Sequence, residues 1–392
     1  KGHYLPYDSA GKLTSQRISD LFKHIDEDGI QRFFDLRMNQ TKAKEFLYYD
    51  TTSISSYSKT LSYAQYGYNK EDDKLPQINL GVVFSETTRL PIMYRYLSGN
   101  IPDNKTVPWL LSLLENFSKE TIQLVMDRGF YTQDNVYECI RSGIGFVMGV
   151  KKNLTYVKAA IDTVRDELSD VENYSTLYKT SGKRVQTTYF KPKKGKGHYP
   201  VQVYVYYNRD QAVEQEHQWN TALQERYKEL QSGERKVGYE TDYATYFRKK
   251  EEGRHTQYDY HREKIAERKQ TFGYFVLISS YKIDIWEMLS LYRNKDLIED
   301  AFHNLKMRRL RVASESSLEG KIFVQFVALI LQSYLKRALH ETELDGVHTQ
   351  ADFLAHLNRI DILRHKKYGA TIGEMTVAQK LLYSKTGIPY PV

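Results

Sequence analysis

The sequence predicts an α/β fold built around a sheet of mixed strand direction. Short apolar runs typical of strands alternate with segments whose apolar residues recur every three or four positions, as in helices. One strand pair is joined by a short polar turn, which indicates an antiparallel hairpin within the sheet. A charged stretch, 151–270, interrupts this alternation before another apolar strand follows. The fold class is therefore α/β with an inserted α+β region.

The first half of the chain supplies most of the predicted sheet. Residues 1–40 form a lead-in whose positions 14–30 have helical spacing. Strands are predicted at 46–49, 78–84, 90–96, 122–126 and 145–150. The polar turn 85–88 joins the second and third strands. Helices are predicted at 107–117 and 132–140.

The second half divides into an insertion, a return to the sheet and a tail. Elements after residue 200 are predicted as strands at 201–207 and 273–279 and as helices at 211–231, 285–308 and 318–338. The predicted domains are a first core part at 41–150, the insertion at 151–272, a second core part at 273–340 and a helical tail at 341–392.

The composition is that of a globular protein with a basic balance of charge. The 392 residues include 57 Lys and Arg against 49 Asp and Glu, which gives a net charge of +8 and a pI near 9.0. An excess of cations favours polyanionic partners such as nucleic acid, although many ordinary enzymes are equally basic. The longest apolar run has about ten residues, half of what a bilayer requires, so no membrane span is expected.

The cysteine count and the first residues of the chain indicate the cellular compartment. The single cysteine, Cys139, excludes an intramolecular disulfide and a thiolate zinc cluster. The first residues contain no apolar segment of the kind found in secretory signals. The expected compartment is therefore the cytoplasm.

Two aspartates follow predicted strands directly and point to metal chemistry. Asp50 ends the strand at 46–49, and Asp127 ends the strand at 122–126. Ligands bind at the carboxyl edge of open α/β sheets, and paired carboxylates are what a hard divalent cation requires. The alternative is that each aspartate forms a turn or caps a helix.

The predicted helix at 285–308 carries a polar stripe beside its apolar face. At about 100° per residue, four polar side chains fall within roughly 60° of one another. These residues are Tyr292, Lys295, Glu299 and Lys306. The functional interpretation is a metal-binding carboxylate flanked by cations that hold phosphates. The alternative is a structural row of ion pairs at the border of the core.

These residues resemble the motifs of the DDE transposases of bacterial insertion sequences, in the group with a β-strand-rich insertion. Phe46–Ser53 (FLYYDTTS) is similar to the first-Asp motif, and Val125–Phe130 (VMDRGF) to the second. The third motif has Tyr, two residues, Arg, three residues, Glu, six residues and Lys. The matching residues here are Tyr292, Lys295, Glu299 and Lys306. Lys295 departs from the family's arginine, keeping the charge but losing bidentate geometry toward phosphate.

The resemblance implies a ribonuclease H-like core that the insertion interrupts before the third acid. Such a core holds two Mg²⁺ (or Mn²⁺) ions between Asp50, Asp127 and Glu299. The implied enzyme is a metal-dependent endonuclease and polynucleotidyl transferase that performs DNA cleavage and strand transfer at insertion-sequence ends. The resemblance places Tyr292, Lys295 and Lys306 on the phosphates of DNA. Arg293 is a candidate to replace the family's arginine, and Arg308 and Arg309 are candidates to extend the basic track. For these last two the alternative is stabilisation of a helix C-terminus by cations.

The resemblance also implies partners and a setting. The DNA is double-stranded, as terminal inverted repeats and as target, and the setting is the bacterial cytoplasm. A homodimer is expected, because two ends must be joined in one complex. Trp219 and Trp286 are candidates for a stacking wedge on DNA, with core packing as the alternative.

Other functions stay open at the level of sequence. A ribonuclease H-like nuclease without strand transfer would need the same three acids. A catalytically retired DNA-binding protein would bind DNA with no requirement for metal. A basic protein whose acids only cap helices is a further alternative, and it predicts no effect of divalent metal on stability.

Overall fold

The chain folds into two compact units. The computed structural model describes residues 14–389, apart from 42–44, 59, 68–74, 116, 118–121, 191–198, 253–254, 296–297, 299–301, 303–311, 313, 345–348, 358–359, 361, 366–368 and 388. The first unit comprises Lys1–Thr106, Glu120–Ile122 and Asn294–Val392, and the second comprises Val107–Lys119 and Gln123–Arg293.

The first unit contains three antiparallel strands. β1 (Glu45–Ser55), β2 (Gln77–Ser85) and β3 (Pro91–Ser98) lie in the order β3-β2-β1. β1 and β2 pair without interruption from Leu47 opposite Ser85 to Ser55 opposite Gln77. Every position of β2 is buried, as expected for a strand with a neighbour on each side and both faces covered. The hairpin predicted around residues 85–88 is confirmed.

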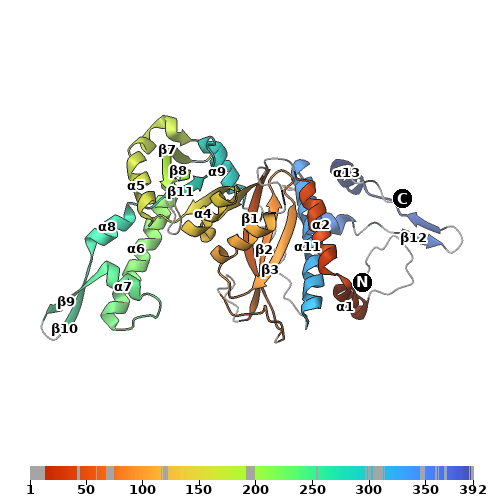
Figure 1. Ribbon diagram of the computed structural model, residues 1–392, viewed down its shortest axis with the longest axis horizontal. Helices are drawn as coiled ribbons and strands as arrows, with labels where there is room; N and C mark the ends of the chain where they lie inside the picture. Colours follow the sequence, from red (N-terminus) through yellow and green to blue (C-terminus); the bar gives the residue numbers. More distant parts are fainter. Residues whose placement is uncertain are drawn as a thin grey trace. The chain divides into compact units, whose positions relative to one another are not determined.

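Three helices of the first unit cover β3 and one another. α2 (Glu27–Asn39) and α11 (Glu315–Glu341) pack on β3, and α1 (Ser15–His24) packs on α11 (Figure 1). α2, β3 and α11 meet through aromatic side chains. The rings of Phe34, Tyr94 and Phe326 lie with centroids 4.8–5.7 Å apart, two of the three pairs edge-to-face. This cluster stabilises the packing of α2, β3 and α11, because aromatic pairs contribute free energy beyond that of the apolar area they bury.

The single helical stretch predicted at 14–30 is two helices. Asp26 has an extended backbone and caps α2, and its side chain accepts a hydrogen bond from the backbone N–H of Gly29 at 2.6 Å. An N-cap residue cannot continue a preceding helix, because its backbone leaves the helical region. α1 therefore ends at His24 and the chain turns before α2 begins.

Among the described helices, α11 is long and apolar enough to cross a membrane, with a mean hydropathy of 1.4 over an 18-residue window. The prediction based on uninterrupted apolar runs missed this, because Gln325 divides the run while the average stays high. Leu318, Ile322, Phe326 and Leu329 of α11 are nearly inaccessible within the unit. One face of α11 therefore packs in the core of the first unit, while Leu331 and Tyr334 are exposed.

The C-terminal tail departs from the predicted helical tail. α12 (Gln350–Leu357) and α13 (Val377–Thr386) flank a two-stranded hairpin of β12 (Ile362–His365) and β13 (Gly369–Ile372). Leu339, Leu344, Phe353 and Leu382 pack as a small core of the two helices and the end of α11. The prediction of an all-helical tail is wrong at the hairpin, since strands of four residues are too short for a period-two pattern to stand out.

The second unit is built on a larger set of strands in the order β4-β5-β11-β8-β7-β6. Their bounds are β4 (Ile122–Met126), β5 (Gly145–Val150), β6 (Tyr174–Ser175), β7 (Thr180–Phe190), β8 (Tyr199–Tyr207) and β11 (Tyr274–Ser279). β4 and β5 are parallel, and the other described pairings in this unit are antiparallel. The prediction of an α/β fold with a mixed sheet is confirmed.

Helices and single 3-10 turns complete the two units. The helices of the second unit outside its arm are α3 (Val107–Leu114), α4 (Gln133–Arg141), α5 (Thr155–Val164) and α9 (Ile285–Arg293). The 3-10 turns are η1 (Asp103–Lys105) in the first unit and η3 (Arg128–Phe130), η4 (Glu167–Ser169) and η5 (Val171–Asn173) in the second.

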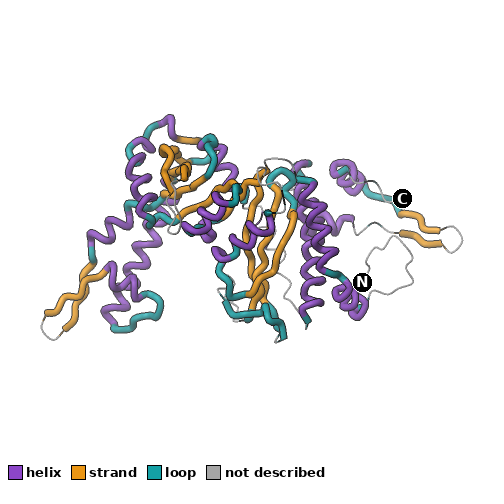
Figure 2. Tube along the Cα trace, viewed as in Figure 1, coloured by secondary structure: helices purple, strands orange, loops and turns teal. Residues whose placement is uncertain are grey.

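An arm leaves the sheet of the second unit between β8 and β11. It consists of α6 (Arg209–Ser232), α7 (Glu240–Tyr246), the hairpin β9 (Phe247–Glu252) and β10 (His255–Tyr260), and α8 (Arg262–Lys269). Figure 2 shows these helices leading away from the strands to the hairpin at the tip. The arm has its own small core of Leu223, Leu230, Tyr243 and Phe247. Trp219 packs beside it, edge-on to Tyr246, which favours packing over a DNA wedge for this residue.

The strand predicted at 201–207 inside the insertion is confirmed as β8 and belongs to the sheet of the second unit. β8 pairs with β11 from Tyr207 opposite Tyr274 to Gln202 opposite Ser279, and β11 pairs with β5. Residues 209–269 form the arm, whereas β7 and β8 extend the sheet. The domain boundaries predicted at 151 and 272 stay a prediction.

Candidate active site

Asp50 lies within β1 and not at its end. It stands opposite Val82 of β2, and five further residues of β1 continue the pairing to Ser55. Thr51, Thr52 and Ile54 are buried, and such β-branched residues sustain a strand. The prediction that Asp50 sits at the rim of the sheet is therefore wrong. Its side chain is half-buried and accepts a hydrogen bond from the backbone N–H of Thr51 at 2.7 Å.

The neighbours of Asp50 fasten β1 to the segment that follows β3. The Thr51 hydroxyl donates to Oδ1 of Asp103 at 2.5 Å, and the Tyr49 hydroxyl donates to the Thr106 hydroxyl at 2.9 Å. Burial raises the pKa of the Tyr49 phenol, so it remains a hydrogen-bond donor. Because side chains alternate along a strand, these contacts lie on the face opposite Asp50 and fix the backbone that carries it.

Asp127 occupies the position predicted for it, directly after β4. Its backbone is extended and it precedes the 3-10 turn η3. The Tyr292 hydroxyl, from the last turn of α9, donates to Oδ1 of Asp127 at 2.7 Å. The half-buried carboxylate is thus oriented by a residue 165 positions away in the chain.

Gly149 on β5 makes room for this hydrogen bond. A Cβ at position 149 would lie 2.5 Å from the Tyr292 hydroxyl and 3.2 Å from the backbone nitrogen of Arg128. Any larger residue would therefore push the phenol away from Asp127. Sequence reasoning missed this role, because a glycine inside a strand signals a close approach without naming the partner.

The predicted helix at 285–308 is broken after α9. α9 ends at Arg293, and Asn294 and Lys295 form a turn. The Asn294 side chain hydrogen-bonds to the Tyr48 side chain of β1. Tyr292 and Lys295 are therefore not on one continuous helical stripe. Glu299, Lys306, Arg308 and Arg309 lie outside the described residues.

Comparison with known families decides the identity. Residues 41–333 match the sequence model of the family described as "Transposase DDE domain". The chain belongs to this family. The matched segment spans well over half of the chain.

Solved structures that align with this DDE-domain chain include two DNA-processing proteins. The piggyBac transposase, in a synaptic complex with hairpin DNA, aligns with a TM-score of 0.41 and 10% identity over 95% of this chain and 57% of that chain. Endonuclease V of Ciona intestinalis, in complex with inosine-containing DNA, aligns with a TM-score of 0.21 and 10% identity over 49% of this chain and 77% of that chain. No curated protein sequence matches the chain.

The cationic residues of the DDE-domain chain near its third motif have distinct surroundings. The Arg293 guanidinium lies 5.1 Å from the centre of the Tyr178 ring, and Tyr178 stacks on Trp286 at 6.2 Å. Stacking of a guanidinium on an aromatic face orients it while leaving N–H donors at its edge. Lys295 is half-buried on the turn after α9.

The acids of the transposase domain offer oxygen donors. Asp50 belongs to the first unit and Asp127 to the second. Within the described residues, no group of three His, Cys, Asp or Glu side chains comes together. Glu299 would have to complete such a group, and it is not among those residues. Carboxylates of this kind suit Mg²⁺ or Mn²⁺, which prefer oxygen ligands.

Proposed function

We propose that this chain catalyses DNA transposition, cutting DNA at the ends of an insertion sequence and joining them to target DNA. The observation that carries the proposal is the Asp127–Tyr292 hydrogen bond, which joins the second acid of the family to the first residue of its third motif. Family membership supports the chemistry, and the half-buried Asp50 on β1 supplies the first acid.

The proposed core is ribonuclease H-like, with Asp50, Asp127 and Glu299 as ligands of two Mg²⁺ or Mn²⁺ ions. When bound, these ions would lower the pKa of the attacking hydroxyl and stabilise the leaving oxygen. Tyr292 holds the Asp127 carboxylate in one orientation, as outer partners of metal ligands do. The bonds of Tyr49 and Thr51 hold the backbone on either side of Asp50.

The proposed reaction has two balanced steps. First, water attacks a phosphodiester, the bond from phosphorus to the 3′-oxygen breaks, and the proton of the water ends on that oxygen. The products are a 3′-hydroxyl and a 5′-phosphate. Second, the 3′-hydroxyl attacks a phosphodiester of the target, forming one bond while the target's own 3′-oxygen leaves with the proton.

The proposed DNA contacts surround the third motif. They come from Tyr292, Arg293, Lys295, Lys306, Arg308 and Arg309. The DNA is proposed to be the terminal inverted repeats and the target, bound by two copies of the chain in the bacterial cytoplasm. The overall charge of +8 supports a polyanionic partner.

Metal binding tests the three acids directly. Calorimetric titration with Mn²⁺ is performed on the wild type beside Asp50→Asn, Asp127→Asn and Glu299→Gln, with DNA present. Loss of the metal signal in all three variants supports a single site. Asp170→Asn, which alters an exposed aspartate of the second unit, is the matched control and should bind metal as the wild type does. A wild type that binds no metal even with DNA present would favour a retired active site.

Strand transfer separates the transposase from a simple nuclease. DNA carrying the sequences that flank the gene is incubated with the protein, Mn²⁺ and a supercoiled target plasmid. Joined products are expected from the wild type and none from Glu299→Gln. Nicking without any joined product would support the nuclease without strand transfer.

A further inference from the structure

A cavity of about 550 Å³ opens in the second unit beside the Asp127–Tyr292 pair. Its walls come from β5, β11 and α9, and from α6 and α8 of the arm. Two of its lining residues are Tyr292, which donates the hydrogen bond to Asp127, and Gly149, which leaves room for that bond. A cavity of this size accommodates a nucleotide-sized group.

The charged side chains that line the cavity are all cationic. They are Arg128, Lys151, Lys152 and Arg268, and no Asp or Glu is among the lining residues. Within the described part of the chain, none of the four makes an ion pair with a carboxylate. Cations gathered without counter-charges repel one another, so an anion that enters the cavity relieves that repulsion.

Lys152 is the most enclosed of these cations. Its Nζ donates to the backbone carbonyl of Thr271 at 2.7 Å and to Oε1 of Gln215 at 3.3 Å. These partners fix the ammonium at the wall of the cavity but do not neutralise it. Burial, followed by the charges of Arg268 and Arg128, lowers the pKa of Lys152 to about 8. The ammonium is therefore mostly charged at neutral pH, in surroundings that favour an added anion.

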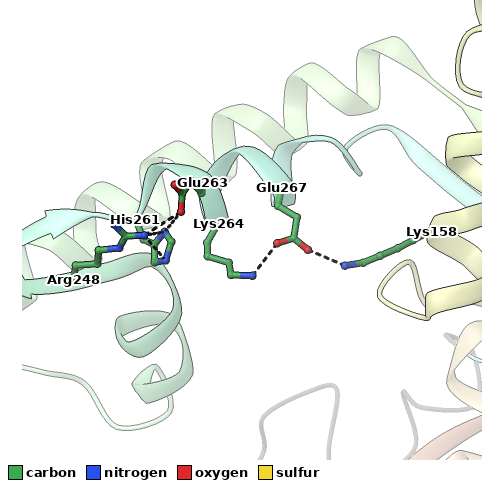
Figure 3. Close-up of polar contacts among 6 residues, drawn as sticks. All are labelled: Lys158, Arg248, His261, Glu263, Lys264 and Glu267. Carbon is green, nitrogen blue, oxygen red and sulfur yellow. Dashed lines mark hydrogen bonds and ion pairs between the residues drawn. The ribbon is translucent and has the colours of Figure 1, made fainter.

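Arg268 is held at the cavity by the contacts of its neighbours on α8. Glu267 pairs with Lys158 of α5 at 3.0 Å (Figure 3), and Lys269 pairs with Glu216 of α6 at 2.8 Å. The Arg268 guanidinium lies 5.8 Å from the centre of the Trp219 ring. Each exposed pair contributes little energy alone. Together they tie α8 to two other helices and fix the direction in which Arg268 extends.

We propose that this cavity binds one phosphate group of a DNA strand through Arg128, Lys151, Lys152 and Arg268. The inference rests on the proposed function for the identity of the strand. A phosphate is the anion that such a strand offers, and several cations around one site match its charge and its oxygen acceptors. Because Tyr292 lines the cavity and donates to Asp127, the cavity adjoins this carboxylate. None of the four cations belongs to the third motif.

The test measures binding without catalysis. Fluorescence anisotropy in EDTA follows a labelled single-stranded oligonucleotide with a 5′-phosphate, with the wild type, Lys152→Gln, Arg268→Gln and the double variant. We expect each single variant to weaken binding about tenfold. Each phosphate that the protein neutralises releases condensed counterions, so log affinity falls against log salt with a slope of about 0.7 per phosphate for single strands. Because Lys152 and Arg268 are proposed to contact the same phosphate, the double variant should lower this slope no more than a single variant does.

Matched controls keep the test decisive. Lys282→Gln removes an exposed lysine outside the cavity and should bind as the wild type does. Lys152→Arg keeps the charge and should retain binding, which separates loss of the site from misfolding. Equal affinity of wild type, Lys152→Gln and Arg268→Gln would overturn the proposal. A double variant that lowers the salt slope by the sum of the two single losses would also overturn the proposal, since that result indicates a diffuse basic surface.

Three probes distinguish the source of the phosphate. The 5′-phosphorylated strand is compared with the same strand carrying a 5′-hydroxyl and with inorganic phosphate as competitor. A Lys152-dependent preference for the phosphorylated end supports a terminal phosphate, and equal Lys152-dependent binding of both strands supports an internal one. Displacement by inorganic phosphate with no effect of Lys152→Gln on DNA would overturn the assignment to DNA. These measurements contain no metal, so a chain that fails to cleave DNA can still pass them.

Discussion

The Tyr292 hydroxyl donates a 2.7 Å hydrogen bond to Oδ1 of Asp127 and so joins the end of α9 to the end of β4. The two residues are far apart in the sequence, and the contact lies wholly within the second unit. A ring fixed at one end of a packed helix gives the carboxylate one preferred orientation. This contact therefore orients the Asp127 carboxylate within the folded second unit.

Removing the Tyr292 hydroxyl should weaken the site without unfolding it. Tyr292→Phe keeps the ring and deletes the donor to Asp127. We expect a loss of about 10- to 100-fold in metal affinity or cleavage rate, as for other outer partners of metal ligands. Mn²⁺ titration and plasmid nicking measure the two effects. Tyr66→Phe, which alters an exposed tyrosine of the first unit, is the control. Wild-type behaviour of Tyr292→Phe would remove this bond from the mechanism.

Gly149 should matter only through Tyr292. In Gly149→Ala the new methyl group would lie 2.5 Å from the phenol oxygen, so the phenol must leave Asp127. We expect cleavage to fall to the level of Tyr292→Phe. The double variant Gly149→Ala with Tyr292→Phe should be no worse than either single variant, because the colliding oxygen is gone. Fully additive losses would show that Gly149 acts on some other neighbour.

Phosphate binding in the cavity should weaken as the pH rises through about 8. The pKa of Lys152 is about 8, lowered from the ordinary 10.5. Above that pH Lys152 loses its proton, so the cavity loses one positive charge. Anisotropy between pH 6 and 9.5 should show this loss in the wild type and a flat profile in Lys152→Arg. Parallel profiles for the two proteins would show that another group titrates.

The lowered pKa of Lys152 also predicts the direction in which stability changes with pH. The folded chain binds fewer protons at Lys152 than the unfolded chain between pH 8 and 10.5. The contribution of this group to stability therefore rises with pH across that window. Bound phosphate should reverse the trend, since it favours the charged form. Urea titrations at pH 7 and pH 9.5, for the wild type and Lys152→Arg, check the direction.

The aromatic cluster of the first unit should dominate its stability. Phe326 is 1% exposed and its ring contacts Phe34 and Tyr94. Phe326→Ala should cost about 3–5 kcal/mol, as truncation of a buried phenylalanine generally does. Val324→Ala, at a partly exposed position of the same helix, should cost far less. Urea unfolding of both variants measures the difference, and equal costs would contradict the packing described for α11.

Several elements could be predicted from the sequence because their signals are local. The hairpin of β2 and β3, the strand β11 and the position of Asp127 after β4 were all indicated by runs and turns of a few residues. Predictions failed where a distant contact decided the outcome. β1 continues past Asp50 because β2 pairs with it from Leu47 to Ser55, and α9 ends directly before Asn294, whose side chain contacts Tyr48.

The sequence by itself determined the family, which the match of residues 41–333 confirms, while the assignment of the acids and cations to its motifs stays a prediction. It also determined the α/β class, because strand and helix periods are read from neighbouring residues. Only the tertiary structure decided which groups meet. Asp127, Gly149 and Tyr292 are brought together by strand pairing and helix packing, and so are the cations of the cavity, from η3, the end of β5 and α8. Contacts between residues more than a hundred positions apart depend on the register of the whole sheet, and no local pattern encodes that register.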